Sequence, residues 1–136
     1  MTSFTSIRSQ IQASISVQQA VLENQKIITQ IGVLEHSCLS ALKSGGKIIF
    51  AGNGGSFADA QHLSAEFTSR FLFDRAPLAL GCNNSAISAI GNDYGYEQVF
   101  ARELGGIANL GDVFIPISTS GNSPSILAAV ALAKES

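Results

Sequence analysis

The stretch "KIIFAGNGGSFADAQHLSAEF", residues 47–67, decides the fold. Its first part, "KIIFAG", is a short β-rich run; the glycine loop "GNGGS" follows, and the remainder has helical spacing. The same order returns twice: "PLALGC" (77–82) precedes "NNSAISAIGND" (83–93), and "GDVFIPIS" (111–118) precedes "TSGNSPSILAAVALAKE" (119–135). The β-rich runs are apolar and do not alternate, which is typical of parallel strands covered on both faces. The sequence therefore predicts an α/β fold with a parallel sheet between two layers of helices.

Helical spacing dominates the chain before the first of these units. Residues 4–44 contain no proline and a single glycine, Gly32. We expect two helices here, with a break near Asn24 and a stop at Gly45-Gly46. Their stripes are Ile7, Ile11, Ile15, Gln18 and Leu22, and then Ile27, Ile31, Leu34, Cys38 and Leu42. Residues 1–44 are thus predicted to be a helical oligomerisation region and residues 45–136 a partial α/β domain, with a single domain overall.

Charged side chains are scarce in this chain. Hydrophobic residues make up 46% of the 136 residues and charged residues only 13%, so we expect a homo-oligomer that covers apolar surface. The net charge of −2 argues against a broad nucleic-acid interface. No apolar run approaches the roughly 20 residues of a membrane span, so no membrane association is expected. Cys38 and Cys82 form no CxxC pair, and the N-terminus is too polar for a signal peptide, which together predict a cytoplasmic protein.

Two of the predicted strands end in loops of the same kind. "GNGGS" (52–56) and "STSGNS" (118–123) combine glycine with small hydroxyl or amide side chains at the start of a helix. Exposed N–H groups and the helix dipole favour an anion at such a position, and the carboxyl ends of parallel strands are where α/β sheets bind ligands. Neither loop has the lysine of a P-loop, and "GNGGS" is not GxGxxG. The alternative is that both loops are ordinary turns and N-caps. The hydroxyl donors of the second loop would be Ser118, Thr119, Ser120 and Ser123.

The helix after "GNGGS" carries two stripes. The predicted buried stripe is Ala60, Leu63, Phe67 and Phe71, and the polar stripe is Asp59, His62, Glu66 and Arg70. His62 and Glu66 are one turn apart, a spacing that suits two ligands of one metal or a carboxylate held beside an imidazole. The alternative is a solvated polar face with an incidental pair. Because the first turn of the same helix is the expected anion site, we expect the pair to lie a few ångströms below a bound phosphate.

The motifs "AGNGGSFADAQHLSAEFTSRF" (51–71), "AISAIGNDYGYEQVFARE" (86–103) and "GDVFIPISTSGNSPSI" (111–126) resemble the sugar isomerase (SIS) domain family. Within that family they resemble the phosphoheptose isomerase branch. The resemblance implies a three-layer parallel sheet of flavodoxin-like strand order and a tetramer built on a helical bundle. It also implies isomerisation of sedoheptulose 7-phosphate to glycero-manno-heptose 7-phosphate through an enediol, in bacterial synthesis of the lipopolysaccharide core. The nearest competing branch binds the replication initiator DnaA and usually departs from the isomerases near "GNGGS" and at the glutamate.

The resemblance also implies a role for individual residues. Glu66 would be the catalytic base, and His62 and Glu66 would be ligands of a zinc cofactor. Arg70 would orient the Glu66 carboxylate, or form a plain surface ion pair. The implied sugar-phosphate site consists of Asn53, Gly54, Gly55, Ser56, Glu66, Asn92, Asp93, Ser118, Thr119, Ser120 and Ser123.

The chain departs from the family pattern after "LAKES" (132–136). Members of the resembled family continue with two more strands and a last helix, whose glutamine and histidine complete the zinc site and supply the second acid–base group. The resemblance therefore predicts an SIS domain that is incomplete at its C-terminus and impaired isomerisation by these residues alone. The alternative function is a non-catalytic SIS module that binds a phosphosugar or a partner protein such as DnaA.

Overall fold

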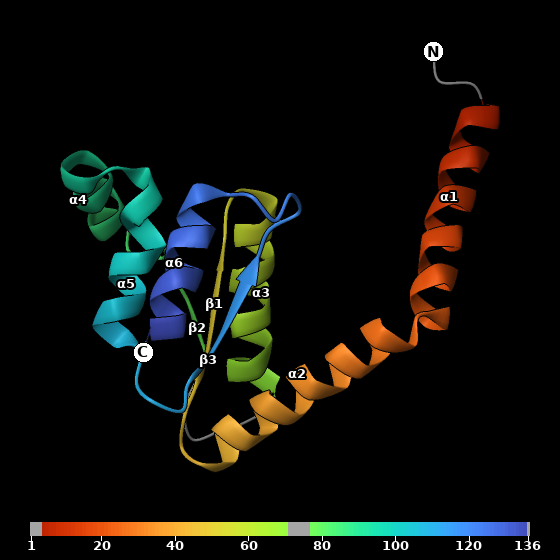
Figure 1. Ribbon diagram of the computed structural model, residues 1–136. Helices are drawn as coiled ribbons and strands as arrows, with labels where there is room; N and C mark the ends of the chain where they lie inside the picture. Colours follow the sequence, from red (N-terminus) through yellow and green to blue (C-terminus); the bar gives the residue numbers. More distant parts are fainter. Residues whose placement is uncertain (1–3, 71–76, 136) are drawn as a thin grey trace. The chain divides into compact units, whose positions relative to one another are not determined.

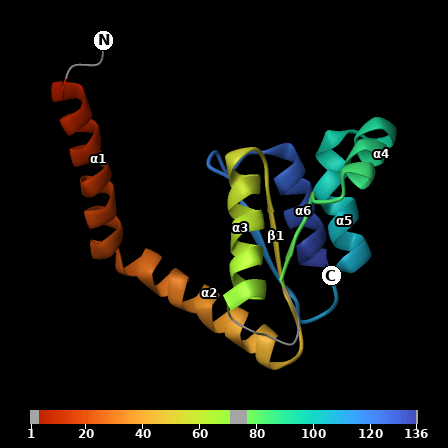
Figure 2. The same ribbon diagram turned by 180° about the vertical axis from the view of Figure 1, so that it is seen from behind.

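The computed structural model describes residues 4–70 and 77–135 (Figures 1 and 2). Helices and strands alternate after two N-terminal helices, as the sequence predicts. In chain order the elements are α1 (Phe4–Glu23), α2 (Gln25–Lys43), β1 (Ile48–Gly52), α3 (Gly55–Arg70), β2 (Leu78–Ala79), α4 (Asn84–Tyr94), the short 3₁₀ helix η1 (Tyr96–Gln98), α5 (Val99–Ile107), β3 (Val113–Ile117) and α6 (Pro124–Glu135). None of the helices among the described residues is long and apolar enough to cross a membrane.

The chain separates into two compact units, residues 1–37 and 38–136. In the first unit, Asn24 lies between α1 and α2, and its side-chain Oδ1 accepts hydrogen bonds from the N–H groups of Lys26 (3.1 Å) and Ile27 (3.2 Å). This is an N-cap, which satisfies two of the donors that a helix start leaves unpaired. The predicted break near Asn24 is confirmed.

The sheet of the second unit is parallel and has the order β2-β1-β3. In the register, Ile49 of β1 stands beside Leu78 of β2 and beside Phe114 of β3. This order, with the first strand between the second and the third, is the flavodoxin-like arrangement that the resemblance implies. β2 is much shorter than the predicted run, because Pro77 has no N–H to donate and Gly81 turns the chain with φ +85°.

Two cores lie on the two faces of β1, because successive side chains of a strand point to opposite sides. Ile48 and Phe50 pack with Ala60 of α3. Ile49 and Ala51 lie on the other face, in a core completed by Leu80 and by Val99, Phe100, Ala101, Leu104, Ile126 and Ala129 of α5 and α6. Figures 1 and 2 show α3 on one side of β1 and α5 and α6 on the other. The predicted three-layer α/β arrangement is confirmed.

The sequence did not predict α5. Val99, Phe100 and Leu104 are at most 2% exposed and supply much of one core. The signal was present, since Phe100, Leu104 and Ile107 have the i, i+4, i+7 spacing of a helix face.

The predicted buried stripe of α3 is only partly buried. Ala60 is fully buried and Phe67 packs against the core, but Leu63 is 38% exposed. Phe71 lies outside the described residues. Leu63 thus remains in contact with solvent in one chain.

Candidate functional site

The loops after β1 and β3 meet at the carboxyl edge of the sheet. They enclose an open pocket of about 150 Å³, lined by Asn53, Ser56, Ile117, Ser118, Thr119, Ser120 and Ser123. We call these lining residues the cradle. Gly54 and Gly55 connect Asn53 to Ser56 along the chain. Both loops lie at the carboxyl ends of parallel strands, as predicted, and they meet there.

A tight turn builds the β1 side of the cradle. The N–H of Ser56 donates to the carbonyl of Asn53 at 3.0 Å, and Gly54 adopts φ +57°, a left-handed conformation that favours glycine. Gly52 precedes this turn, and a Cβ on it would lie 2.3 Å from the backbone oxygen of Ser56. Glycine is therefore required at position 52 by the close approach of the α3 start, a role that the sequence analysis did not assign.

Serine hydroxyls organise the β3 side of the cradle. Ser118 Oγ accepts from the N–H of Gly121 at 3.1 Å, and Ser120 Oγ accepts from the N–H of Asn122 at 3.2 Å. A hydroxyl that accepts a backbone N–H keeps its own hydrogen for donation. The sequence analysis expected backbone N–H groups to face the anion, but these two already have partners. The hydroxyl groups of Ser118 and Ser120 are thus available to donate to an anion.

Asn53 joins both sides of the cradle. Its Nδ2 donates to Ser123 Oγ at 2.8 Å and to Ser125 Oγ at 3.0 Å, while Tyr96 donates its hydroxyl hydrogen to Asn53 Oδ1 at 2.8 Å. The sequence analysis missed Ser125 and Tyr96. Tyr96 lies 43 positions from Asn53, so only the fold brings them together.

His62, Glu66 and Arg70 lie together on the outer face of α3. His62 Nε2 is 4.0 Å from Glu66 Oε1, and Arg70 Nε is 3.0 Å from Glu66 Oε2. The side chains of His62 and Glu66 are 74% and 32% exposed. The predicted i,i+4 pair is therefore present, and Glu66 contacts both of its helix neighbours.

This face is not part of the pocket lining. At a helix rise of about 1.5 Å per residue, His62 lies about 9 Å and Glu66 about 15 Å beyond Ser56 along the axis of α3. The expectation that the pair lies a few ångströms below the anion is wrong, because it neglected the length of two to three helical turns. A ligand that touches both the cradle and Glu66 must be long.

The chemistry of the donors fits zinc only in part. An imidazole nitrogen and a carboxylate oxygen are ordinary zinc ligands, and a separation of 4.0 Å needs only a small side-chain rotation to bring both onto one ion. No cluster of three or more His, Cys, Asp or Glu side chains suited to a metal occurs within residues 4–70 and 77–135. His62 and Glu66 thus suit two of the four positions of a tetrahedral site.

Asn92 and Asp93 lie outside the cradle. Both are exposed on α4, where Asn92 Nδ2 donates to Asp93 Oδ1 at 2.8 Å. With Asn84, Ser85, Ser88 and Ala89 they line a separate, open hollow. Within one chain, the predicted sugar-binding pair does not join the other candidate residues.

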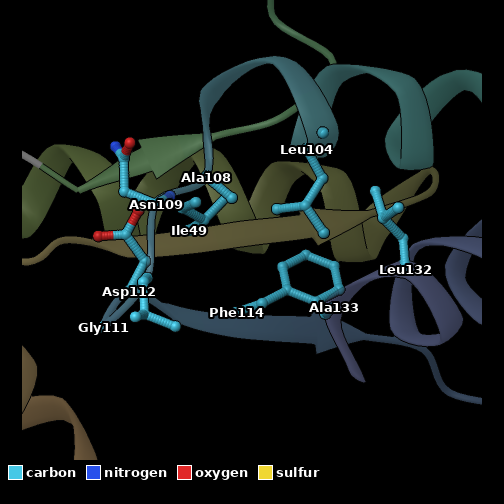
Figure 3. A pocket seen from close by; sticks show the side chains of 11 residues that line it. Ile49, Leu104, Ala108, Asn109, Gly111, Asp112, Phe114, Leu132 and Ala133 are labelled. Carbon is cyan, nitrogen blue, oxygen red and sulfur yellow. Dashed lines mark hydrogen bonds between the residues drawn. The ribbon is translucent and has the colours of Figure 1, made fainter. Parts of the chain in front are cut away.

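A larger pocket, of about 260 Å³, lies near the opposite edge of the sheet (Figure 3). Figure 3 shows Ile49, Leu104, Phe114 and Leu132 around it, with Asn109 and Asp112 at one side. This pocket adjoins the amino end of β3, whereas open α/β sheets bind ligands at the carboxyl ends of their strands. The cradle therefore remains the candidate site despite its smaller size.

The fold and the cradle define a class of protein. Residues 10–136 match the SIS domain, so the chain belongs to the SIS domain family.

Within that family the relatives are phosphoheptose isomerases, as the sequence resemblance indicated. The phosphoheptose isomerase of Aneurinibacillus thermoaerophilus is 48% identical over 132 residues, which are 95% of this chain and 67% of that protein. That of Burkholderia pseudomallei is 46% identical over 133 residues, 96% of this chain and 68% of that protein. The chain thus spans about two thirds of the length of these relatives.

Solved structures give the same result. A phosphoheptose isomerase from Neisseria gonorrhoeae superposes with a TM-score of 0.84 at 40% identity, covering 95% of this chain and 67% of that one. One from Francisella tularensis gives a TM-score of 0.86 at 33% identity, covering 99% of this chain and 71% of that one.

Proposed function

We propose that this chain converts sedoheptulose 7-phosphate to glycero-manno-heptose 7-phosphate, a step of bacterial heptose synthesis that leads to the lipopolysaccharide core. The observation that carries the proposal is the meeting of the two loops in one cradle, at the start of the helix that also bears Glu66. The relatives that are named phosphoheptose isomerases support the same reaction. They do not favour the alternative of a non-catalytic SIS module.

The cradle would hold the phosphate group. Hydroxyl groups on Ser118, Thr119, Ser120 and Ser123 can donate to phosphate oxygens, and Asn53, Gly54, Gly55 and Ser56 would line the adjoining part of the substrate. The starts of α3 and α6 both adjoin this pocket, so the positive ends of two helix dipoles add to the attraction for an anion.

Glu66 would act as the general base. Its carboxylate removes a proton from C1 of the ketose, an enediol(ate) forms in which a proton passes from the C1 hydroxyl to O2, and the carboxylic acid returns its proton at C2. Arg70, 3.0 Å away, orients the carboxylate. His62 and Glu66 would hold zinc, which when bound polarises the oxygens that gain charge. A heptose phosphate is an extended ligand, as contact with both the cradle and Glu66 requires.

The rest of the site would come from assembly. Asn92 and Asp93 are exposed and lie apart from the cradle, so they would reach the sugar hydroxyls of a neighbouring subunit's site. Most of the apolar stripe of α1, together with Ile31 and Leu34 of α2, is exposed in one chain, which supports a homo-oligomer joined through these helices, with a tetramer as the proposed form. The reaction uses a soluble sugar phosphate, which fits a cytoplasmic location.

Inorganic phosphate tests the cradle. It should raise the melting temperature of the chain relative to chloride at equal ionic strength, because a ligand that binds only the folded state adds about 2.7 kcal/mol at 100 times its Kd. Ser120→Ala combined with Ser123→Ala should remove this protection. A melting temperature that does not change with added phosphate would refute the assignment of the cradle as a phosphate site.

Glu66→Gln separates chemistry from binding. In an isomerisation assay with zinc present, the variant should lose about 10²–10⁴-fold of the parent's turnover, since the amide cannot accept the C1 proton. Protection by phosphate should stay close to that of the parent. Equal turnover of the two proteins would exclude Glu66 as the base.

A further inference from the structure

A chain of hydrogen bonds connects the cradle to a tyrosine outside it. Tyr96, the first residue of η1, donates to Asn53 Oδ1 at 2.8 Å, and Asn53 Nδ2 donates in turn to Ser123 (2.8 Å) and Ser125 (3.0 Å). Ser123 and Asn53 line the pocket, whereas Tyr96 and Ser125 do not. Ser125 is only 3% exposed, so its hydroxyl depends on protein partners.

The direction of these hydrogen bonds affects whether the pocket can bind an anion. An asparagine side chain has an accepting end and a donating end, and a half-turn of the amide exchanges them. With Oδ1 occupied by the tyrosine hydroxyl, the amide N–H groups face Ser123 and Ser125, and both serines act as acceptors.

The serine hydrogens are consequently not used on Asn53. The two serine oxygens are 3.4 Å apart, so one hydroxyl can donate to the other; when Ser125 is the donor, the hydrogen of Ser123 remains for the pocket, which Ser123 lines. With the amide reversed, its N–H groups would donate to the Tyr96 hydroxyl oxygen, and Ser123 would donate to Oδ1 and present lone pairs to the pocket. Lone pairs repel a phosphate oxygen, whereas a hydroxyl hydrogen binds it.

We propose that Tyr96 is a positioning residue of the phosphate site: its hydroxyl donates to Asn53 Oδ1 and so holds the Asn53 side chain, whose amide leaves the Ser123 hydroxyl hydrogen available to the bound phosphate group. The inference rests on the proposed function, because it takes the cradle as the phosphate site. It assigns a task to η1, which joins α4 to α5 and contains no residue of the cradle.

The direct test is Tyr96→Phe, with inorganic phosphate as the probe and its Kd measured by calorimetry. Loss of one hydrogen bond of ordinary strength predicts about two- to tenfold weaker phosphate binding. Tyr94→Phe is the matched control. Tyr94 is 53% exposed against 54% for Tyr96, its ring lies 3.7 Å from Cζ of Arg102, and its hydroxyl has no hydrogen-bond partner among the described residues. Its substitution should leave the Kd unchanged.

A double-mutant cycle separates positioning from a general structural effect. If Tyr96 acts through Ser123, then Tyr96→Phe should change the Kd little in a chain that already carries Ser123→Ala. In a steady-state assay, Tyr96→Phe should raise KM and leave kcat within about twofold of the parent, because a phosphate contact is made in both ground and transition states. Full additivity of the two substitutions would overturn the inference.

Asn53→Leu provides a second variant of similar size without hydrogen-bonding groups. It removes the amide and should weaken phosphate binding at least as much as Tyr96→Phe does. If the parent binds phosphate and either variant binds it equally well, the role of Tyr96 is refuted while the phosphate site stands. If the parent itself does not bind phosphate, the proposed function fails first.

Discussion

Gly52 is the residue on which the shape of the cradle depends most directly. It ends β1, and the first turn of α3 passes so close that a Cβ would lie 2.3 Å from the backbone oxygen of Ser56. The two nearest atoms are the backbone oxygen and the carbonyl carbon of Ser56, and neither is the end of a flexible side chain. The backbone itself would therefore have to move. The loop that carries Asn53 would move with it.

We therefore predict that Gly52→Ala destabilises the protein by about 3 kcal/mol or more, the upper range for overpacking. Gly91→Ala is the control, because nothing lies within 4 Å of a Cβ at this helical position in α4. That substitution should be neutral or slightly stabilising, since alanine favours helices over glycine. Urea denaturation of both variants measures the difference, and similar values for the two would contradict the steric argument.

At this scale the sequence predicted the residues whose chemistry is local. The glycine loop, the serine-rich loop and the helical His–Glu pair can each be recognised from residues that lie a few positions apart. Tyr96 and Ser125 could not be predicted, because their importance arises from contacts with Asn53 across 43 and 72 positions. The error in the distance from the cradle to Glu66 has a different cause. Helical periodicity shows which residues share a face, but the distance along the axis follows from the rise per residue, which was not considered.

Among the elements, the starts of β1 and β3 are connected by Asp112, which precedes β3 and bonds to Lys47, just before β1. Its Oδ1 accepts from the N–H of Lys47 at 2.9 Å and its Oδ2 accepts from the N–H of Asn109 at 2.8 Å. The Lys47 ammonium pairs with the same carboxylate, and both side chains are largely buried. Burial alone would raise the pKa of Asp112, but the hydrogen bonds from Lys47 and Asn109 and the lysine charge outweigh it and lower the pKa below its usual value.

A lowered pKa in the folded state gives a definite dependence on pH. The ionised carboxylate stabilises the fold fully above the unfolded pKa of about 3.9, and this contribution is lost as the pH falls through the lower, folded pKa. Asp112→Asn should lower the free energy of unfolding at pH 7 by about 1.5–3 kcal/mol, the usual range for a hydrogen-bonded charged group. It should also reduce the acid limb, which is the fall of this free energy below about pH 4. Urea unfolding between pH 7 and pH 3 measures both effects.

Asp59→Asn serves as the control for that experiment, because Asp59 is exposed on α3. It should leave both the stability at pH 7 and the acid limb as in the parent. An Asp112→Asn variant with the same acid limb as the parent would show that the ionised carboxylate does not stabilise the contact between the two strands.

The sequence predicted most elements because their periodicity is strong over many residues. Two elements depart from the prediction. α5 was not predicted, although the apolar spacing between Tyr94 and Asn109 is helical. β2 is only two residues long because Pro77 and Gly81 limit the ladder, and these residues were visible in the sequence.

For the whole molecule, the exposed apolar stripes of the N-terminal helices are the dominant feature. Ile11 and Ile15 are 57% and 53% exposed, and Ile7, Leu22, Ile31 and Leu34 are exposed as well. Water contact with this much aliphatic surface is unfavourable by about 25 cal/mol per Å². We predict that the protein sediments as a homo-oligomer, and that Ile11→Glu with Ile15→Glu shifts it to smaller species.

Ser9→Glu with Ala13→Glu adds the same two charges to the opposite face of α1 and should leave the sedimentation unchanged. A parent chain that sediments as a monomer at micromolar concentration would contradict the prediction. An assembly that survives the isoleucine substitutions would place the contact elsewhere.

The open position of His62 on α3 has a consequence for how the protein must be assayed. An isolated chain leaves 74% of the His62 side chain and 32% of the Glu66 side chain in contact with solvent. Electrostatic stabilisation of a developing enediolate is strong only where water is excluded. In the proposed homo-oligomer, another chain would cover this face during turnover. Specific activity should therefore fall on dilution and recover on reconcentration, so the rate per chain reports association as well as chemistry.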